Sequence, residues 1–292
     1  MLQMVKYNFL IFIAFIVCGC AHLDIKGMFI PTSDSVEARF SQSAKMNVEL
    51  KECVIEADED YVFYVATDPH IDRTSRNLSI FNDVSRNDDE AVFGVVLGDC
   101  TDVKDNLHSY LDALAYSSED HAHDFRIFHV LGNHDIFFDG WKSFKELIGP
   151  SVYWFEVEFA QGKDLYITLD TANGTLGGKQ TEWFRTFLEN NRSSYRHCIL
   201  LTHTNLFYTD NSQTSSGNMP LEETYSLMDI LARYDVSLVL QGHDHYREIL
   251  TYDNVCYVVI GAISDKSDTP EYLKVEVSSE GLGLNWKIIN QS

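Results

Sequence analysis

The sequence is poor in basic residues. It contains 22 lysines and arginines against 44 aspartates and glutamates, which gives a formal net charge of −22 at pH 7. Nothing in the chain resembles a basic stripe, and an acidic surface repels the phosphates of nucleic acids. Nucleic acid is therefore not an expected partner, and a general nuclease is a poor interpretation. A small phosphate ester could still be attracted by the local charge of a bound metal ion.

Internal repeats and low-complexity tracts are also absent. Hydrophobic residues make up 45% of the 292 positions, which is enough for a sizeable core and excludes a disordered chain. The length is compatible with one or two domains.

No apolar run is long enough for a comfortable membrane span. The longest one, residues 8–17, has the length of a secretory signal core. It ends in Val17-Cys18-Gly19-Cys20, which resembles the lipobox of bacterial lipoproteins, although Cys18 is unusual at its position. We therefore expect a signal peptide at 1–19, a lipid on Cys20 that anchors the protein to the membrane of the bacterial cell envelope, and a tether at 20–33. An ordinary signal peptide or an N-terminal anchor is the alternative, and each reading puts the mature domain outside the cytoplasm.

Few cysteines would remain after cleavage beyond Gly19. Cys100 and Cys198 lie in or beside apolar strands and are expected to be buried free thiols. A disulfide between Cys53 and Cys256 is compatible with an oxidising compartment, and the sequence leaves it open.

The rest of the chain reads as an N-terminal packing extension at 34–58 and one catalytic domain at 59–292. In the extension we expect a helix over residues 34–46, with Asp34 as its N-cap, and an edge strand over 48–56. The domain begins with near-continuous apolar runs, which are typical of strands buried on both faces. Its first strands are expected at 61–66, 91–97 and 125–131, with helices at 78–86 and 104–116 between them.

The second half of the domain continues the alternation. Further strands are expected at 153–159, 165–170, 197–201, 237–241, 246–250, 255–260, 272–277 and 283–289. Helices at 179–190 and 221–233 separate some of them. This rhythm predicts a layered fold of the α/β (α+β) class.

Five short polar segments each follow one of these apolar runs. They are Asp68-Pro69-His70, Gly98-Asp99, Gly132-Asn133-His134-Asp135, Thr202-His203 and Gly242-His243-Asp244-His245. In isolation each segment would be a surface loop or turn. Together they offer carboxylate, amide and imidazole ligands, a set that suits divalent first-row metals. The sequence therefore predicts one metal site built from distant pieces of the chain.

The order and content of these segments resemble the calcineurin-like metallophosphoesterases over roughly residues 61–265. The resemblance implies a four-layer αββα sandwich, in which two mixed β-sheets are flanked by helices. It also implies a dinuclear metal site at the carboxyl ends of the strands.

The resemblance assigns seven ligands to two metal ions. One ion would be held by Asp68, His70, Asp99 and His245. The other would be held by Asp99, Asn133, His203 and His243, so that Asp99 bridges the two. Manganese, iron and zinc all suit this set. A purple iron centre is not expected, since no tyrosine follows Asp99 at the matching place. Asp102 does not match a ligand position and is expected to be a helix N-cap.

The implied reaction is hydrolysis of a small phosphate ester by a metal-bridged hydroxide. His134 matches the family histidine that is not a ligand and protonates the leaving alkoxide, and Asp135 would hold its ring. Phosphomonoesters and phosphodiesters both remain open as substrates, as does the oligomeric state.

Two other classes of function compete with this interpretation. A catalytically inactive, lipid-anchored binding or surface protein would be expected to lose His134 or a ligand, and this chain has lost none. A structural zinc site would be a closed tetrahedron rich in cysteine. The remaining histidines match no ligand position; only His121 and His123 could line the site, together with Tyr208 and Tyr246.

Overall fold

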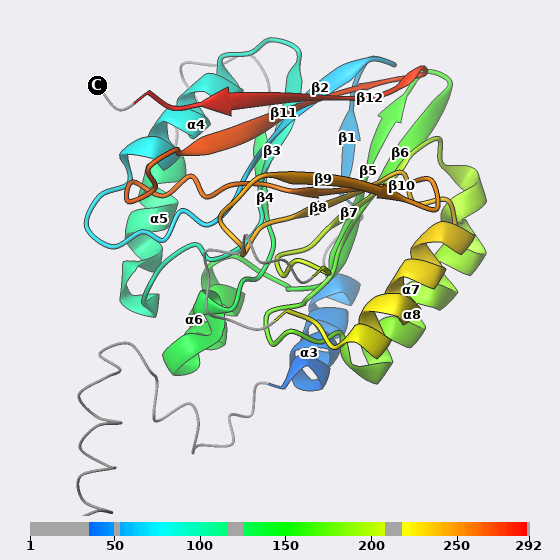
Figure 1. Cartoon of the computed structure of the whole chain (residues 1–292), viewed down its shortest axis with the longest axis horizontal. Coiled ribbons are helices and arrows are strands. Elements are labelled where there is room, and N and C mark those ends of the chain that lie inside the picture. The colour runs from blue at the N-terminus through cyan, green and yellow to red at the C-terminus, as the bar shows by residue number, and fades with distance from the viewer. Residues whose placement is uncertain (1–34, 50–52, 116–124, 208–217, 291–292) are drawn as a thin grey trace, which may run out of the picture. The chain divides into compact units, whose positions relative to one another are not determined.

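Two mixed β-sheets form the middle layers of the fold (Figure 1). The computed structural model describes residues 35–49, 53–115, 125–207 and 218–290, all within a unit of residues 33–292. The five-stranded sheet has the order β12 (Gly281–Ile288), β11 (Glu271–Ser278), β2 (Tyr61–Ala66), β3 (Ala91–Val96), β4 (Arg126–His129). The seven-stranded sheet has the order β1 (Val54–Glu56), β5 (Tyr153–Phe159), β6 (Gly162–Thr168), β7 (Cys198–Leu201), β8 (Leu238–Gln241), β10 (Val255–Val259), β9 (Glu248–Tyr252).

The strands that lead to the polar segments run parallel within each sheet. β2, β3 and β4 are parallel neighbours, and so are β6, β7, β8 and β10. Parallel neighbours bring their carboxyl ends to the same edge of a sheet, so the segments that follow them meet there.

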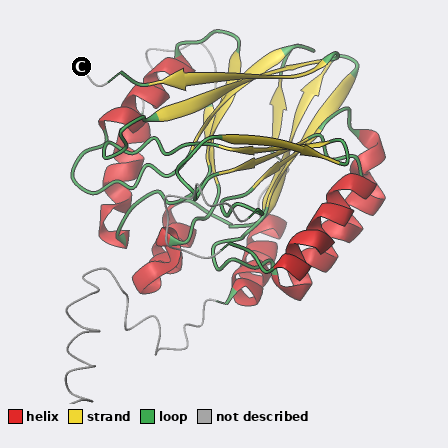
Figure 2. Cartoon of the chain, in the orientation of Figure 1, coloured by secondary structure: helices red, strands yellow, loops and turns green. Residues whose placement is uncertain are grey.

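Helices cover the outer face of each sheet, which gives four layers (Figure 2). α4 (Arg76–Arg86), α5 (Leu107–Leu114) and α6 (Gly140–Leu147) share a hydrophobic cluster with the five-stranded sheet. α7 (Gly177–Asn191) and α8 (Leu221–Arg233) share another with the seven-stranded sheet, and α3 (Val36–Glu49) packs against it through Phe40. Short 3-10 helices are η1 (Lys104–Asn106), η2 (His134–Asp139) and η3 (Arg192–Ser194). The expected αββα architecture is confirmed.

The apolar strands owe their composition to burial on two faces. In β2, Phe63 and Val65 belong to the cluster between the sheets, whereas Tyr64 and Ala66 belong to the cluster beneath the helices. Residues of a strand alternate between faces, so a strand with a core on both sides is apolar throughout.

Helix α3 is tied to the rest of the unit by a buried ion pair. Arg39 donates to both carboxylate oxygens of Asp170 at 2.7 and 2.8 Å, and neither side chain is exposed. Strand β1 extends the larger sheet by pairing with β5. The expected boundaries of the signal, tether, extension and catalytic domain stay predictions.

Several expected elements differ in detail. Val48, expected in an edge strand, lies in α3, and β1 contains only residues 54–56. Helix α6 was not expected. Residues 1–34, including Asp34 and the apolar run, lie outside the described residues, and within those no helix is long and apolar enough to cross a membrane.

The cysteines carry no disulfide in the described structure. Cys100 and Cys198 are buried free thiols, as expected. Cys53 directly precedes β1, and Cys256 lies in β10, five positions away in the sheet order. Strands are spaced by about 4.8 Å, so roughly 24 Å separates the two, which rules out a disulfide between them in this fold.

Candidate metal centre

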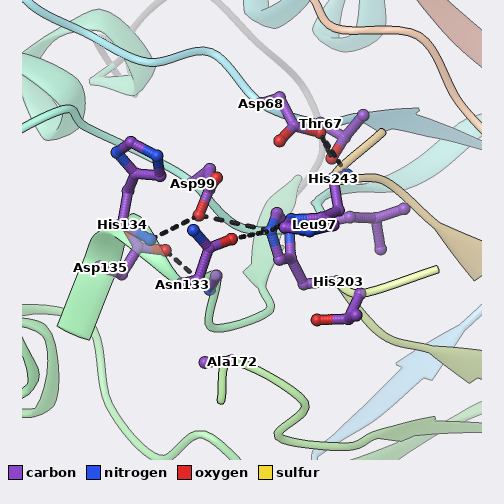
Figure 3. Close-up of polar contacts among 12 residues, drawn as sticks. Thr67, Asp68, Leu97, Asp99, Asn133, His134, Asp135, Ala172, His203 and His243 are labelled. Atoms are coloured by element: carbon purple, nitrogen blue, oxygen red, sulfur yellow. Dashed lines mark hydrogen bonds and ion pairs between the residues drawn. The ribbon is translucent and has the colours of Figure 1, made fainter. Parts of the chain in front are cut away.

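The seven predicted ligands come together where the two sheets place their strand ends. Asp68 and His70 follow β2, Asp99 follows β3 and Asn133 follows β4, all from the five-stranded sheet. The other three ligands come from the seven-stranded sheet: His203 follows β7, and His243 and His245 follow β8. Figure 3 shows five of the seven side chains around one centre.

Left-handed backbone turns most of these residues toward the centre. Half of the ten non-glycine residues with positive φ in the described ranges are candidate ligands. They are Asp68 (52°), His70 (47°), Asp99 (51°), His243 (71°) and His245 (58°). Such conformations cost energy in residues with a Cβ atom, and they persist at sites where the surrounding structure imposes them.

Two glycines allow the ligand segments to approach one another. A Cβ atom on Gly132 would lie 2.1 Å from the backbone nitrogen and 2.2 Å from Oδ1 of Asp99. A Cβ atom on Gly242 would lie 1.9 Å from Oγ1 of Thr67 and 2.6 Å from Oδ2 of Asp68. The two glycines are therefore required by close packing of the segments themselves.

One group of ligand atoms surrounds Asp68. The Nε2 atom of His245 lies 3.2 Å from Oδ1 of Asp68, and Nε2 of His70 lies 3.7 Å from the same oxygen. The two Nε2 atoms are 3.1 Å apart, and Nε2 of His70 is 3.6 Å from Oδ2 of Asp99. These are the four residues expected to hold the first metal ion.

A second group surrounds His203. Its Nε2 atom lies 3.0 Å from Oδ1 of Asn133, 3.2 Å from Nδ1 of His243 and 3.3 Å from Oδ1 of Asp99 (Figure 3). Asp99 thus turns one carboxylate oxygen toward each group, which fits the expected bridging position.

The donor atoms fit a metal better than they fit one another. His203 donates from Nδ1 to the carbonyl oxygen of Leu97 at 2.7 Å, so Nε2 of the neutral ring is a lone pair facing other acceptors. Oδ1 of Asp68 is buried with no hydrogen-bond partner among the described residues, and Nδ1 of His243 faces Nε2 of His203 at 3.2 Å. Buried polar atoms are nearly always paired with a donor, so acceptor atoms that converge on one another in this way are the expected arrangement around a cation.

The electrostatics of the centre also favour a cation. Burial disfavours the charged imidazole of His203, but the charge of Asp99 and its hydrogen bond outweigh this and raise the pKa to about 9. Burial likewise opposes ionisation of Asp99, yet His203 and His70 hold the pKa of its carboxyl well below the usual range. The centre therefore stabilises positive charge, which protons or metal ions can supply.

His134 lies at the rim of the same centre. Its ring meets that of His70 edge-on at 4.7 Å and contacts the Phe137 ring at 4.9 Å. Among the described residues, three groups of side chains are close enough to hold a metal ion. Two of them lie within the expected ligand sets: Asp68, His70 and His245, and Asp99, His203 and His243. The third joins His134 to His70 and Asp99.

Asp135 was expected to hold the His134 ring, but its carboxylate bonds to other groups. The carboxylate of Asp135 accepts from the backbone N–H groups of Cys100 and Gly132, each at 2.9 Å. Nδ1 of His134 is buried with no hydrogen-bond partner among the described residues. Burial and then the charge of Asp99 raise the pKa of Asp135 to about 7. Asp135 therefore ties the segments of Asp99 and Asn133 together and does not orient His134.

One further side chain at the centre was misassigned from sequence. Asp102 does not cap a helix, because η1 begins at Lys104 and its N-cap residue is Val103, which makes no capping hydrogen bond with its side chain. Instead, Oδ1 of Asp102 lies 3.0 Å from Nδ1 of His70. The bare sequence carries no signal for this contact, since the two residues are 32 positions apart.

The remaining candidates do not enter the centre. His129 contacts the hydroxyl of Tyr110 at 2.7 Å, and neither it nor His197 belongs to a candidate metal-binding group in the described ranges. The Tyr246 hydroxyl donates to Glu248 at 2.8 Å. His121, His123 and Tyr208 lie outside the described residues.

A family model described as calcineurin-like phosphoesterase matches residues 61–247. The chain belongs to this family. All seven candidate ligands lie within the matched range, and both groups of ligand atoms converge as a pair of metal ions requires. This calcineurin-like phosphoesterase is therefore expected to use two metal ions.

Solved structures have the same fold at low sequence identity. GAP50 from Plasmodium, the anchor in the inner membrane complex, has a TM-score of 0.62 and 15% identity over 78% of this chain and 84% of its own. A dimetal phosphatase from Danio rerio has a TM-score of 0.57 and 13% identity over 80% and 99%. The purple acid phosphatase PPD1 from yellow lupin has a TM-score of 0.60 and 15% identity over 79% and 52%. No curated protein sequence matches this one.

Proposed function

We propose that this phosphoesterase hydrolyses small phosphate esters with two metal ions held by the seven residues described above. The observation that carries the proposal is the convergence of carboxylate, amide and imidazole ligand atoms from two sheets within hydrogen-bonding distance of one another. Asp68, His70, Asp99 and His245 would hold one ion, and Asp99, Asn133, His203 and His243 the other. When bound, such ions supply Lewis acidity, which neutralises charge on phosphoryl oxygens and lowers the pKa of water.

The side chains around the ions would orient the ester and move one proton. His134 is next to the first ligand group and is not needed to complete either set. We assign it the proton that passes to the leaving oxygen, a step for which a neighbouring imidazole is well suited. Its ring is held by contacts with His70 and Phe137.

Hydrolysis of bis(p-nitrophenyl) phosphate and of p-nitrophenyl phosphate tests this proposal. We expect the manganese-loaded protein to turn over at least one of them and chelator to stop it. Turnover of the diester alone would assign a phosphodiesterase, and turnover mainly of the monoester a phosphatase. Two bound metals with no turnover of either ester would favour an inactive binding protein on this fold.

The role of His134 has its own test. His134→Asn should lower kcat by about 10²–10⁴-fold for esters with alkyl leaving groups and by less for p-nitrophenolate, which needs no proton. His108→Asn, on the exposed face of α5, is the matched control and should leave kcat unchanged. An equal loss for both kinds of leaving group would contradict proton donation by His134.

We also propose that the protein is exported and anchored to a bacterial envelope membrane by lipid on Cys20. The support is the short apolar run and the sequence Val17-Cys18-Gly19-Cys20. Metabolic labelling with an alkyne fatty acid should label the protein and its Cys18→Ser variant, but not Cys20→Ser. Labelling that survives in Cys20→Ser would contradict the assignment.

A further inference from the structure

The surroundings of His70 suggest how its ring is aimed. We infer that Asp102 is a positioning residue that fixes His70 for metal binding, an inference that rests on the function proposed above. The contact joins Oδ1 of Asp102 to Nδ1 of His70 at 3.0 Å. Asp102 itself belongs to neither ligand group.

Backbone pairing places Asp102 beside His70. Beyond the ends of β2 and β3, the N–H of His70 donates to the carbonyl of Asp99 at 3.0 Å, and the N–H of Ile71 donates to that of Cys100 at 3.1 Å. Ile71 and Thr101 form an isolated parallel bridge. The two segments therefore continue the sheet for a few residues in fixed register, which brings the next residue, Asp102, to the side of the His70 ring.

The contact decides which nitrogen of His70 can bind a metal. An ionised carboxylate only accepts hydrogen bonds, so it selects the tautomer that carries the proton on Nδ1. The lone pair is then on Nε2, the atom that faces Asp68, Asp99 and His245. Without Asp102 the ring would be free to change tautomer and to turn away from this position.

A lysine from the loop between β10 and β11 holds the far side of Asp102. Nζ of Lys266 lies 2.8 Å from Oδ2 of Asp102 and 3.5 Å from Oδ2 of Asp72. Next to it, the carboxylate of Asp265 accepts from the first N–H groups of α4, which anchors the segment after β10. Because Lys266 is 60% exposed, its own contribution is screened by solvent and is expected to be small.

This arrangement predicts a graded series of variants. Asp102→Leu removes both the acceptor and the charge while it keeps the branched heavy-atom skeleton, and Asp102→Asn keeps a neutral acceptor for Nδ1. Lys266→Met removes only the outer partner. Asp72→Asn is the matched control, because it changes the other carboxylate that pairs with Lys266, and in the described structure Asp72 forms no ion pair with His70.

The test is calorimetric titration of Mn²⁺ into the metal-free full chain in detergent, with Co²⁺ absorption spectra as a second readout. Removing a residue that orients a metal-bound histidine typically costs 10- to 100-fold in affinity. We expect Asp102→Leu to lose this much at one of two sites and to change the Co²⁺ spectrum, with the melting temperature of the metal-free protein unchanged. Asp102→Asn should recover part of the affinity, Lys266→Met should lose a few-fold at most, and Asp72→Asn should match the wild type.

The outcomes separate this inference from the proposed function. If the wild type binds two metal ions and Asp102→Leu binds them equally well, the inference is wrong and the proposed function stands. A uniform fall in melting temperature with unchanged affinities would show a structural role only, which also overturns the inference. A wild type that binds no metal would overturn both.

Discussion

Adding one methyl group at Gly132 should disable the whole centre. A Cβ atom there would lie 2.1 and 2.2 Å from two atoms of Asp99, including its backbone nitrogen, which cannot swing aside. Ordinary contacts are more than 1 Å longer, so the Asp99 and Asn133 segments would have to move apart by about that much. Overpacking of this kind costs about 1–3 kcal/mol.

The expected result for Gly132→Ala is a double loss. For a domain of this size, the cost corresponds to a fall in melting temperature of roughly 2–12 °C. Because Asp99 faces both ligand groups, a displacement near 1 Å should lower kcat by about 100-fold or more. Differential scanning fluorimetry and ester hydrolysis measure the two effects.

Gly178→Ala supplies the control for this variant. A Cβ atom on Gly178, at the start of α7, meets only Oε1 of Glu37 at 3.7 Å, an ordinary contact. It should be neutral or stabilise the protein by up to about 1 kcal/mol, since alanine is the better helix former. A Gly132→Ala protein with wild-type melting temperature and kcat would refute the assignment of close packing at the centre.

Three further predictions concern stability. Arg39→Met leaves the buried carboxylate of Asp170 without its charged partner, and should lower the free energy of unfolding by about 3–5 kcal/mol in urea titrations, with partial recovery in Arg39→Met/Asp170→Asn. Equal stability of the wild type and Arg39→Met would contradict this. Burial lowers the pKa of His129 to about 4, below its ordinary value of 6.5. As the pH falls, the unfolded chain therefore binds a proton before the folded chain does. The contribution of neutral His129 to stability is complete above pH 6.5 and is lost as the pH falls from 6.5 toward 4. Between pH 7.5 and 5.0 the wild type should lose up to about 2 kcal/mol more than His129→Gln, and parallel pH profiles would exclude this cause. Dialysis against chelator should lower the melting temperature reversibly, since an ion present at 100 times its Kd stabilises the folded protein by about 2.7 kcal/mol. A melting temperature that does not depend on metal would argue against a metal site in the folded protein.

Buried strands and strong helices could be predicted closely from the sequence. β2, β5 and α8 have the residues expected of them. β2 is an apolar run with a core on both faces, β5 alternates between apolar and acidic residues, and α8 is a long amphipathic stretch, and each of these patterns allows few alternatives. Helix α6 has a weak sequence signal, because it is short and begins at a glycine, and its only large buried side chains are Trp141 and Phe144. Val48 shows the opposite error: the short alternating pattern around it predicts a strand, whereas α3 continues through it.

The ligand set could be predicted in the same way, whereas its supporting contacts could not. Each ligand follows an apolar strand, and that position is visible in the sequence. Asp135 and Asp102 were assigned the partners nearest in sequence, a histidine ring and a helix end. Asp135 instead bonds Gly132 and the distant Cys100, 35 residues away, and Asp102 contacts His70, 32 residues away; the distant contacts are set by the register between β2, β3 and the segment after β4. Such contacts depend on tertiary geometry, which cannot be read from the local pattern of residues in a single sequence.

The central claim is tested most directly by titrating turnover with metal. Metal-free protein is given increasing Mn²⁺ while hydrolysis of the nitrophenyl esters and bound metal per chain are measured together. The account predicts that turnover rises as the second ion binds and is absent in Asp99→Asn, which lacks the carboxylate facing both groups. Turnover that persists in chelator, or that survives unchanged in Asp99→Asn, would contradict it.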